Sequence, residues 1–336
     1  MTTEPAAGTV EPAKPQRELR LLSVVAPALD EAETVVEFHR RMVEALEGID
    51  FELIVVDDGS TDETPEVLRR TAATDPRLKV ITLSRNFGHQ AAITAGLDHA
   101  KGDAVAIIDS DLQDPPEVIP KLLARWREGV DVVYAVRTVR PGESRAKLAT
   151  SRWFYRLFGR LAHIDLEQNA GDFRLFDRGA LDALNSMRER NRFLRGMSVW
   201  IGFTQTAVPY ERDPRYAGVT KYTPRRMVRF SLDAISSFSH VPLQLATGLG
   251  FLVSMAAFLG IPIAIARKLT GHSVPGVTTI LLAVLLIGGI QLITVGLIGE
   301  YLGRVYDEVK HRPLYVVKDR LNTPARRPGP DDGPPG

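Results

Sequence analysis

Short apolar runs alternate with longer segments of helical periodicity in the first part of the chain. The apolar runs predict strands over residues 21–27, 51–57, 78–83, 104–109 and 130–136. Apolar residues recurring at the helical period predict helices near residues 33–46, 64–74, 88–100 and 117–128. Strands that are apolar throughout and joined by helices are typical of a parallel sheet covered on both faces. We therefore expect an α/β fold with a mostly parallel sheet, which binds ligands at the carboxyl ends of its strands.

The pattern changes in the last third of the chain, where residues 241–266 and 274–299 contain no charged side chain. About 20 helical residues cross the hydrocarbon core of a bilayer, so each run is long enough to span a membrane. A buried helical hairpin of a soluble protein is the alternative, but soluble helices nearly always keep a polar stripe. The two runs therefore predict a pair of transmembrane helices.

Basic residues beside these runs predict their orientation. The flanks carry more basic side chains than the intervening loop, which has Arg267 and Lys268. The flanking ones are Arg225, Arg226, Arg229, Arg304, Lys310 and Arg312. By the positive-inside rule, the catalytic domain and both termini are expected in the cytoplasm, with the protein as a multi-pass component of the plasma (inner) membrane.

Composition separates tails and interfacial segments from the folded chain. Residues 1–16 and 323–336 are rich in proline and small or polar residues, so we expect disordered tails there. The domain between them is expected over residues 17–240, and a cytoplasmic juxtamembrane segment over residues 300–322. Within the domain, residues 144–164 place arginines and aromatic side chains in separate helical rows. That segment and the one near residues 221–239 are expected to lie in the membrane interface, and a core helix is the alternative for residues 144–164.

Overall composition narrows the possible functions. Apolar residues make up 44% and charged ones 25%, which excludes a wholly disordered chain or a protein with many membrane spans. The net charge of +1 supplies no global basic field, so no nucleic-acid partner is expected. The chain has no cysteine, which rules out disulfides, thiolate zinc sites and cysteine nucleophiles.

Acidic residues follow two of the predicted strands. Asp58 comes after the second strand, where its carboxylate can accept hydrogen bonds from a nucleobase or ribose, although a plain turn is the alternative. Asp109 and Asp111 close the fourth strand, and Gln113 follows them. These oxygen ligands can surround Mg²⁺ or Mn²⁺ together with phosphate oxygens. The alternative is a solvated acidic loop that binds no ligand. No Gly-rich dinucleotide fingerprint or P-loop occurs in the chain.

Basic residues in two further loops suggest phosphate contacts. Arg85 lies between the third strand and its helix, whose N-terminus also favours anions. His89 lies in the first turn of that helix, where a lone histidine is more often structural. Arg212, Arg215 and Lys221 lie just before the first apolar run, where an anionic lipid head group would be. A generic basic flank of a membrane span is the alternative.

Taken together, the motifs resemble glycosyltransferase family 2, and within it the polyprenyl-phosphate glycosyltransferases. That branch includes dolichyl-phosphate mannose synthases and bacterial undecaprenyl-phosphate sugar transferases with two C-terminal transmembrane helices. The matching motifs are VVAPALDEAETV, VVDDGSTDET, LSRNFGHQAAITAGLDHAKGDAVAIIDSDLQDPPE, DFRLFDR, RYAGVTKY, ISSFSHVPL and IGEYLGRVYDEVKHRPLYVV. They cover most of residues 21–317.

The resemblance implies a GT-A fold, a nucleotide-sugar donor, Mg²⁺ or Mn²⁺, and inversion at the anomeric carbon. The implied donor contacts are Pro27, Asp30, Glu31, Asp58, Arg85, Asp109, Ser110 and Gln113. The implied metal ligands are Asp109, Asp111 and Gln113. The implied acceptor-phosphate contacts are Arg174, Arg212, Arg215 and Lys221. Asp111 and Asp172 are the implied catalytic residues, and Asp30 replaces the usual asparagine, which puts the local donor-loop hydrogen bonds in doubt.

The implied reaction moves one sugar from a nucleotide diphosphate sugar, UDP-sugar being favoured, to polyprenyl phosphate at the cytoplasmic membrane face. The enzyme is expected to contact membrane lipids and to form a homo-oligomer. A processive polysaccharide synthase would need a Q-x-x-R-W motif and more spans, and a non-catalytic scaffold would be expected to lose a metal carboxylate. A phosphate acceptor with a second pKa of about 6 needs no proton removed at neutral pH. We therefore expect Asp172 to orient Arg174 or neighbouring cations.

Overall fold

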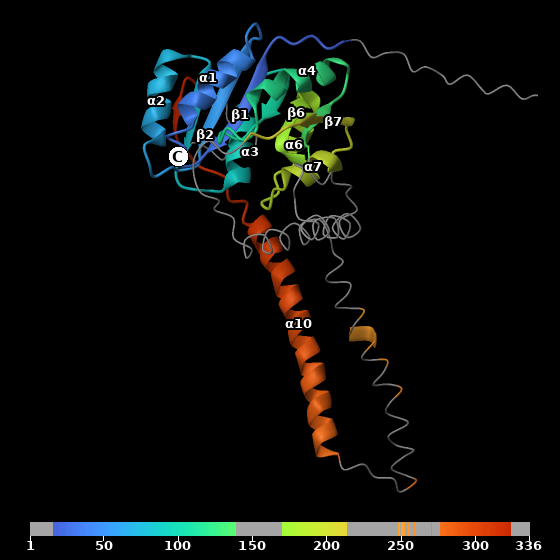
Figure 1. Cartoon of the computed structure of the whole chain (residues 1–336). Coiled ribbons are helices and arrows are strands. Elements are labelled where there is room, and N and C mark those ends of the chain that lie inside the picture. The colour runs from blue at the N-terminus through green and yellow to red at the C-terminus, as the bar shows by residue number, and fades with distance from the viewer. Residues whose placement is uncertain are drawn as a thin grey trace, which may run out of the picture.

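The computed structural model describes residues 16–138, 170–213 and 276–323, with isolated positions between residues 248 and 270. The predicted interfacial helices at residues 144–164 and 221–239 lie outside the described residues, as do nearly all of both predicted tails. The described residues form an α/β domain from which one long helix, α10, projects (Figure 1).

One mixed sheet of eight strands forms the centre of the domain, in the order β7-β5-β6-β4-β1-β2-β3-β8. The strands are β1 (Leu22–Ala28), β2 (Phe51–Asp57), β3 (Leu78–Leu83), β4 (Ala104–Ile107), β5 (Val132–Arg137), β6 (Ala170–Asp177), β7 (Gln205–Tyr210) and β8 (Val317–Leu321). Only β6 and β8 run against the common direction. Every residue of β1, β2 and β4 is buried, which explains their continuous apolar runs. The predicted α/β fold with a mostly parallel sheet is confirmed.

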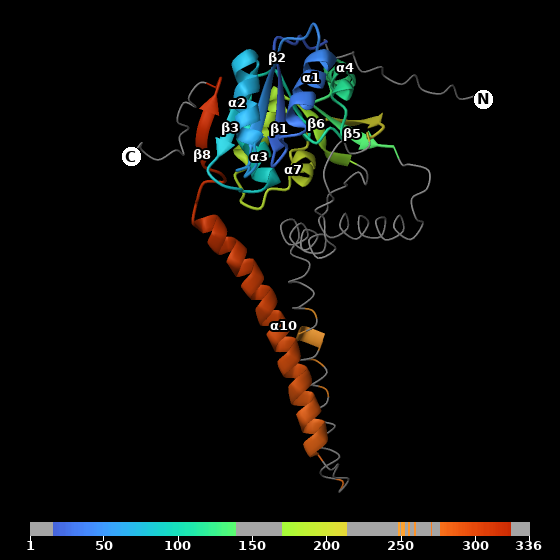
Figure 2. The same ribbon diagram turned by 60° about the vertical axis from the view of Figure 1, so that its left-hand side comes forward.

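Helices cover both faces of this sheet (Figures 1 and 2). They are α1 (Val35–Ala45), α2 (Thr64–Thr74), α3 (His89–His99), the short 3-10 helix η1 (Pro116–Val118), α4 (Ile119–Arg127), α6 (Arg178–Ser186) and α7 (Leu194–Trp200). One buried cluster packs α1, α2 and α4 against the sheet, through side chains such as Phe38 and Trp126. A second cluster packs α3, α6 and α7 on the opposite face, through Ile93 and Leu181 among others. The two apolar layers hold the strand ends in fixed positions.

The edge of the sheet differs from the prediction. The sequence predicts only a juxtamembrane segment over residues 300–322, but residues Val317–Leu321 form β8, which pairs antiparallel with β3 (Figure 2). Charged residues, Lys318, Asp319 and Arg320, occupy the middle of this strand, as is common in an edge strand exposed to water. The chain that follows α10 is therefore part of the domain.

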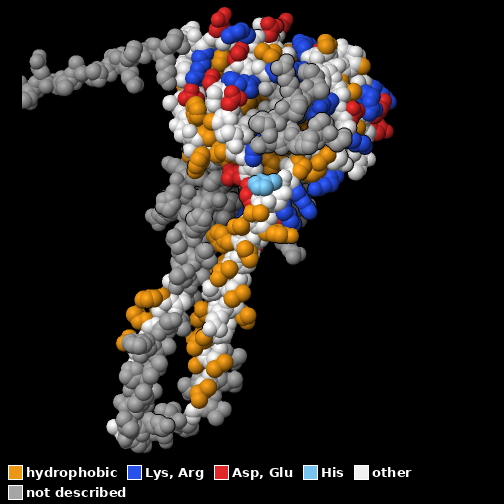
Figure 3. All heavy atoms as spheres, turned by 180° about the vertical axis from the view of Figure 1, so that it is seen from behind, with side chains coloured by type: hydrophobic (Ala, Val, Ile, Leu, Met, Phe, Trp, Pro, Cys, Tyr) orange, Lys and Arg blue, Asp and Glu red, His pale blue; other side chains and the backbone are white. Residues whose placement is uncertain are grey.

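The long helix α10 (Val277–Val309) lies outside the two buried clusters. Among the described residues it is the helix that is long and apolar enough to cross a membrane, over Leu286–Val309, and none of that window is buried. Its apolar side chains are exposed along its length (Figure 3). It extends ten residues past the predicted end at 299. The other predicted span, residues 241–266, lies almost wholly outside the described residues.

Candidate active site

The candidate site is a pocket of about 1410 Å³ at the carboxyl ends of β1 to β4. Its wall is completed by the loop before α7 and by the segment between α10 and β8. Pockets for one small ligand commonly measure about 300–1,000 Å³. The space is therefore sufficient for two substrates held side by side.

Most of the predicted site residues line this pocket. They are Pro27, Glu31, Asp58, Arg85, Asp109, Ser110, Asp111, Gln113, Asp172 and Arg212. Asp30 and Arg174 are not among the lining residues. Arg215 and Lys221 lie outside the residues that the structure describes.

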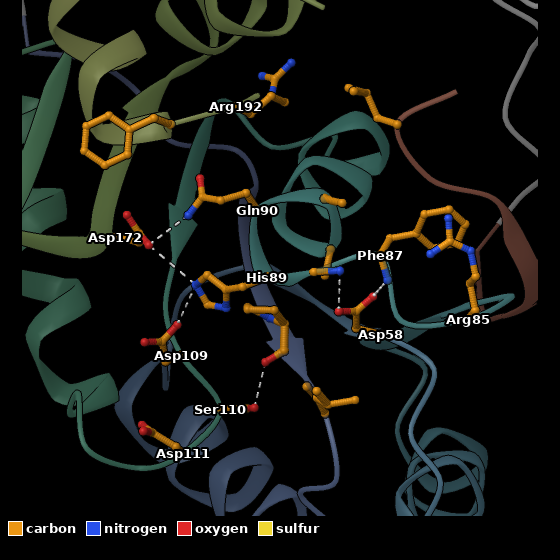
Figure 4. Close-up of a pocket in the computed structure, with 18 of the residues that line it drawn as sticks. Asp58, Arg85, Phe87, His89, Gln90, Asp109, Ser110, Asp111, Asp172 and Arg192 are labelled. Atoms are coloured by element: carbon orange, nitrogen blue, oxygen red, sulfur yellow. Dashed lines mark hydrogen bonds and ion pairs between the residues drawn. The ribbon is translucent and has the colours of Figure 1, made fainter. Parts of the chain in front are cut away.

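Asp58 joins the loop after β2 to the start of α3. Its Oδ1 accepts a hydrogen bond from the Phe87 backbone N–H at 2.7 Å, and its Oδ2 accepts one from Gly88 at 2.9 Å (Figure 4). Desolvation raises the pKa of this buried carboxyl, against the opposing effect of the two backbone bonds. Beside it, Gly59 has φ +74° and a Cβ there would lie 2.5 Å from the Arg85 carbonyl carbon. The two loops are thus packed too closely for a side chain at Gly59.

Asp30 stabilises the same loop from outside the pocket lining. Its φ is 55°, a left-handed conformation in which aspartate and asparagine are enriched. Its Oδ1 accepts a hydrogen bond from the Thr61 backbone N–H at 2.9 Å, and its own N–H donates to Ser60 Oγ at 3.0 Å. An aspartate at this position therefore maintains hydrogen bonds between the loops after β1 and β2. The geometry gives no support to a direct contact of Asp30 with the nucleotide sugar.

The Asp109-Ser110-Asp111 segment follows β4 and is locked to β1. Ser110 Oγ donates to the Pro27 carbonyl at 2.8 Å, and Asp111 Oδ1 accepts from the Gln113 N–H at 3.0 Å. The buried Asp109 Oδ1 has no hydrogen-bond partner among the described residues. Desolvation raises the pKa of Asp109 to about 6, and nearby carboxylates add to this effect while His89 opposes it. A carboxylate oxygen that accepts no hydrogen bond among the described residues fits a metal ligand, although the His89 ring lies 3.5 Å from it.

The protein supplies only part of a metal coordination shell here. The described residues contain no group of three or more His, Asp or Glu side chains arranged to hold a metal ion. Asp109 and Asp111 are hard oxygen donors, and Mg²⁺ usually takes one or two carboxylates together with substrate phosphates. The residues therefore fit an ion that enters with a diphosphate.

His89 occupies the centre of the site, although its sequence position suggested a structural role. Its Nε2 lies 3.5 Å from Asp109 Oδ1 and 3.5 Å from Asp172 Oδ2 (Figure 4). Desolvation acts to lower the pKa of His89, but the two carboxylates outweigh it and raise the pKa. The signal in the sequence was its position in the first turn of α3, a helix that begins at the same edge of the sheet at which β4 ends.

Asp172, on β6, is held as a carboxylate by its neighbours. Its Oδ1 accepts a hydrogen bond from Arg195 Nε at 2.8 Å, and its Oδ2 accepts one from Gln90 Nε2 at 3.1 Å. Desolvation acts to raise the pKa of Asp172, but Arg195 and His89 outweigh it and hold the pKa well below its usual range. A general base works best with a pKa near the operating pH. The geometry therefore favours an orienting role for this carboxylate.

Arg174 does not take the position expected of an acceptor ligand. It is 3% exposed, and its guanidinium donates to Ser198 Oγ and, at 2.9 Å, to the Gly171 carbonyl. Of the two alternatives expected for Asp172, orienting Arg174 or a neighbouring cation, its direct contact with Arg195 favours the neighbouring cation. Arg174 instead ties β6 to α7.

Several pocket residues escaped the sequence reasoning. Arg137 lies at the end of β5, which was a usable signal because that strand end was predicted. The others come from α7, which carries Arg195, and from loops whose positions depend on tertiary pairing: Arg190, Asn191, Arg192, Phe193, Arg312, Pro313, Leu314 and Val316. Val316 reaches the site because its carbonyl accepts a hydrogen bond from the Ser84 N–H at 2.9 Å.

Three comparisons relate this chain to known proteins. Residues 23–184 match the family described as glycosyl transferase family 2. The uncharacterized glycosyltransferase YkcC of Bacillus subtilis (strain 168) is 47% identical over 299 residues, 88% of this chain and 93% of the relative. The bactoprenol glucosyl transferase of Shigella phage SfV is 39% identical over 301 residues, 89% of this chain and 98% of the relative. Glucosyl-3-phosphoglycerate synthase from Mycobacterium tuberculosis, solved with Mn²⁺, UDP and phosphoglyceric acid, covers 64% of this chain and 76% of its own at 23% identity and TM-score 0.47.

Proposed function

Because this chain belongs to glycosyl transferase family 2, we propose that it transfers a single sugar from a nucleotide diphosphate sugar to polyprenyl phosphate. The observation that carries the proposal is the likeness, over nearly the full length of both chains, to a bactoprenol glucosyl transferase. The GT-A type α/β domain and its pocket at the strand ends suit such a donor. UDP-sugar is the favoured donor class.

Different sides of the pocket would bind the nucleoside and the diphosphate of the donor. Asp58 and Arg85, at the ends of β2 and β3, would face the nucleoside, and Asp109 with Asp111 would face the diphosphate. Asp109, Asp111 and Gln113 would hold Mg²⁺ or Mn²⁺, which neutralises charge on the departing nucleotide diphosphate. Ser110 contributes by fixing the loop to β1.

The acceptor side needs cations more than a base. A polyprenyl phosphate dianion can attack the anomeric carbon without losing a proton. Asp172 would then keep Arg195 and His89 in place beside the reacting groups, since it contacts both. Inversion follows from attack on the face of the sugar opposite the leaving diphosphate, which the same pocket would hold in line.

Chain connectivity supports two membrane crossings. β8 follows α10 and pairs with β3, so the chain after α10 lies on the same side as the catalytic sheet (Figure 2). If α10 crosses the bilayer, its first residue lies on the far side, and the chain between β7 and α10 must cross as well. The uncharged run at residues 241–266 lies in that interval. Both termini and the domain would then face the cytoplasm, and the expected homo-oligomer and its lipid contacts stay predictions.

A donor panel tests the proposal. The purified full chain, in vesicles that contain undecaprenyl phosphate, would be incubated with radiolabelled UDP-glucose, UDP-N-acetylglucosamine and GDP-mannose in separate reactions with Mg²⁺ or Mn²⁺. We expect label in the organic extract with one of these donors, and its loss on chelation. Label that enters an ethanol-insoluble polymer would instead favour a processive synthase. No transfer from any nucleotide sugar, with donor still bound, would favour a scaffold.

A further inference from the structure

A buried carboxylate beside the metal motif has no part in the chemistry described so far. Asp114 is 1% exposed and lies three residues after Asp111. Its Oδ1 accepts a hydrogen bond from the Tyr210 hydroxyl at 2.5 Å and lies 3.3 Å from Arg212 Nε. Its Oδ2 lies 3.6 Å from Arg137 Nη2. One buried carboxylate thus touches two arginines that both line the pocket.

Tyr210, the last residue of β7, completes the network. Its ring is 4% exposed and packs edge-on against Phe173, with ring centroids 5.7 Å apart. Its hydroxyl accepts a hydrogen bond from Arg137 Nε at 3.0 Å while it donates to Asp114. Desolvation and the neighbouring carboxylate raise the pKa of Tyr210, so the hydroxyl keeps its proton and the direction of both bonds is fixed.

Both guanidinium groups of the cluster face the pocket. The cluster contains two guanidinium groups and one carboxylate, so the arginines outnumber the carboxylate that they share. The side chains of Arg137 and Arg212 remain 35% and 30% exposed. The two guanidinium groups repel each other, and the carboxylate that they share offsets this repulsion. Guanidinium groups fixed in this way match the fork geometry of phosphate oxygens.

The strand order places this cluster on the side of the pocket away from the nucleoside contacts. β5 and β7, which end in Arg137 and Tyr210, lie on one side of β4 in the sheet, whereas β2 and β3, which lead to Asp58 and Arg85, lie on the other. The Asp109-Ser110-Asp111 segment follows β4 between them. A phosphate bound by the two arginines would therefore approach the diphosphate from the side opposite the nucleoside.

We propose that Asp114 and Tyr210 are positioning residues that hold Arg137 and Arg212 as a two-guanidinium site for the phosphate group of the lipid acceptor. This inference rests on the proposed function. A donor phosphate offers the same chemistry, so a test must separate the two substrates.

The test compares Tyr210→Phe and Asp114→Asn with wild type, in full-length protein reconstituted in vesicles that contain undecaprenyl phosphate. Hydrogen bonds to charged groups are worth enough to change an affinity about 10- to 100-fold. We expect KM for undecaprenyl phosphate to rise by about that factor in both variants, with a smaller change in kcat and an unchanged Kd for the nucleotide sugar by calorimetry. Arg137→Ala should reproduce the effect, and Asp182→Asn, at an exposed site on α6, should not.

Three outcomes are decisive. If the nucleotide-sugar Kd weakens while the acceptor KM is unchanged, the arginines bind the donor and the proposal is overturned. If both parameters stay at wild-type values in Tyr210→Phe, whose ring still packs on Phe173, the network has no positioning role. If wild type makes no lipid-linked sugar with any donor, the proposed function has failed, and that result is read before any variant is compared.

Discussion

At the scale of single residues, the partners of each carboxylate decide its role. Asp109 Oδ1 lies 3.5 Å from His89 Nε2 and accepts no hydrogen bond among the described residues, whereas Asp172 accepts hydrogen bonds from Arg195 and Gln90. Under the proposed function, Asp109 and Asp111 would bind the metal ion, while Arg195 already balances the charge of Asp172. The same acidic residue type thus serves two purposes within one pocket.

This difference predicts unequal effects of removing charge. Asp111→Asn should cut turnover by at least the roughly 10²-fold typical of losing one key electrostatic group. Asp172→Asn should lose less, because its low pKa leaves it ionised throughout the working range and no proton transfer depends on it. Both variants would be assayed with saturating acceptor from pH 6 to pH 9. If Asp172→Asn is the more damaged enzyme and recovers as pH rises, it acts as a base and the argument is wrong.

Gly59 and Gly48 share a left-handed backbone conformation, so the same substitution at both separates steric crowding from backbone strain. Gly59→Ala must displace backbone atoms of Arg85 and Asn86. At Gly48, which has φ +77°, no atom lies within 4 Å of the position of an added Cβ. Gly48→Ala should cost only the roughly 1–2 kcal/mol of left-handed strain. Gly59→Ala should lower the thermal unfolding temperature further and weaken nucleotide binding, measured by calorimetry. Equal effects of the two substitutions would contradict the close packing of the loops.

At the scale of elements, the sequence predicts the parts of the fold that repeat a local pattern. β1 to β5 and α1 to α4 match their predicted ranges closely, because buried strands are apolar throughout and helices keep their period. β6 is missed because Asp172 and Arg174 interrupt its apolar run, and its place between β4 and β5 leaves no trace in local periodicity. The same limit applies to the site: Asp58 and Asp109 follow predicted strands, whereas the contact of Tyr210 with Asp114 depends on where β7 pairs.

The edge strand β8 gives a prediction at this scale. Truncation after Val316 removes the hydrogen bonds of β8 to β3 and those of Asn322 Nδ2 to the carbonyls of Ala72 and Leu78. We expect the unfolding temperature to fall by at least about 4 °C. Nucleotide-sugar affinity should weaken because β8 anchors the preceding segment, in which Arg312, Pro313, Leu314 and Val316 line the pocket. Truncation after Thr323 is the control and should change neither. Normal donor binding without β8 would show that this segment does not shape the pocket.

At the scale of the whole molecule, the pairing of β8 with β3 links membrane topology to the catalytic domain. If α10 spans the bilayer, a reporter at the C-terminus should behave as cytoplasmic, and one inserted at residues 267–272 should be periplasmic. Protease protection in sealed vesicles checks the same arrangement. A periplasmic C-terminus would contradict the expected orientation, and a cytoplasmic loop would contradict the second crossing.

The central claim is that one sugar is joined to the phosphate of a polyprenyl lipid. Mass spectrometry of the lipid product tests it most directly, with wild type and Asp111→Asn reconstituted beside undecaprenyl phosphate and the active nucleotide sugar. The account predicts a wild-type product whose mass is that of the lipid phosphate plus a single sugar residue, with only a trace from the variant. A ladder of products that carry several sugars, or unmodified lipid with sugar found elsewhere, would contradict it.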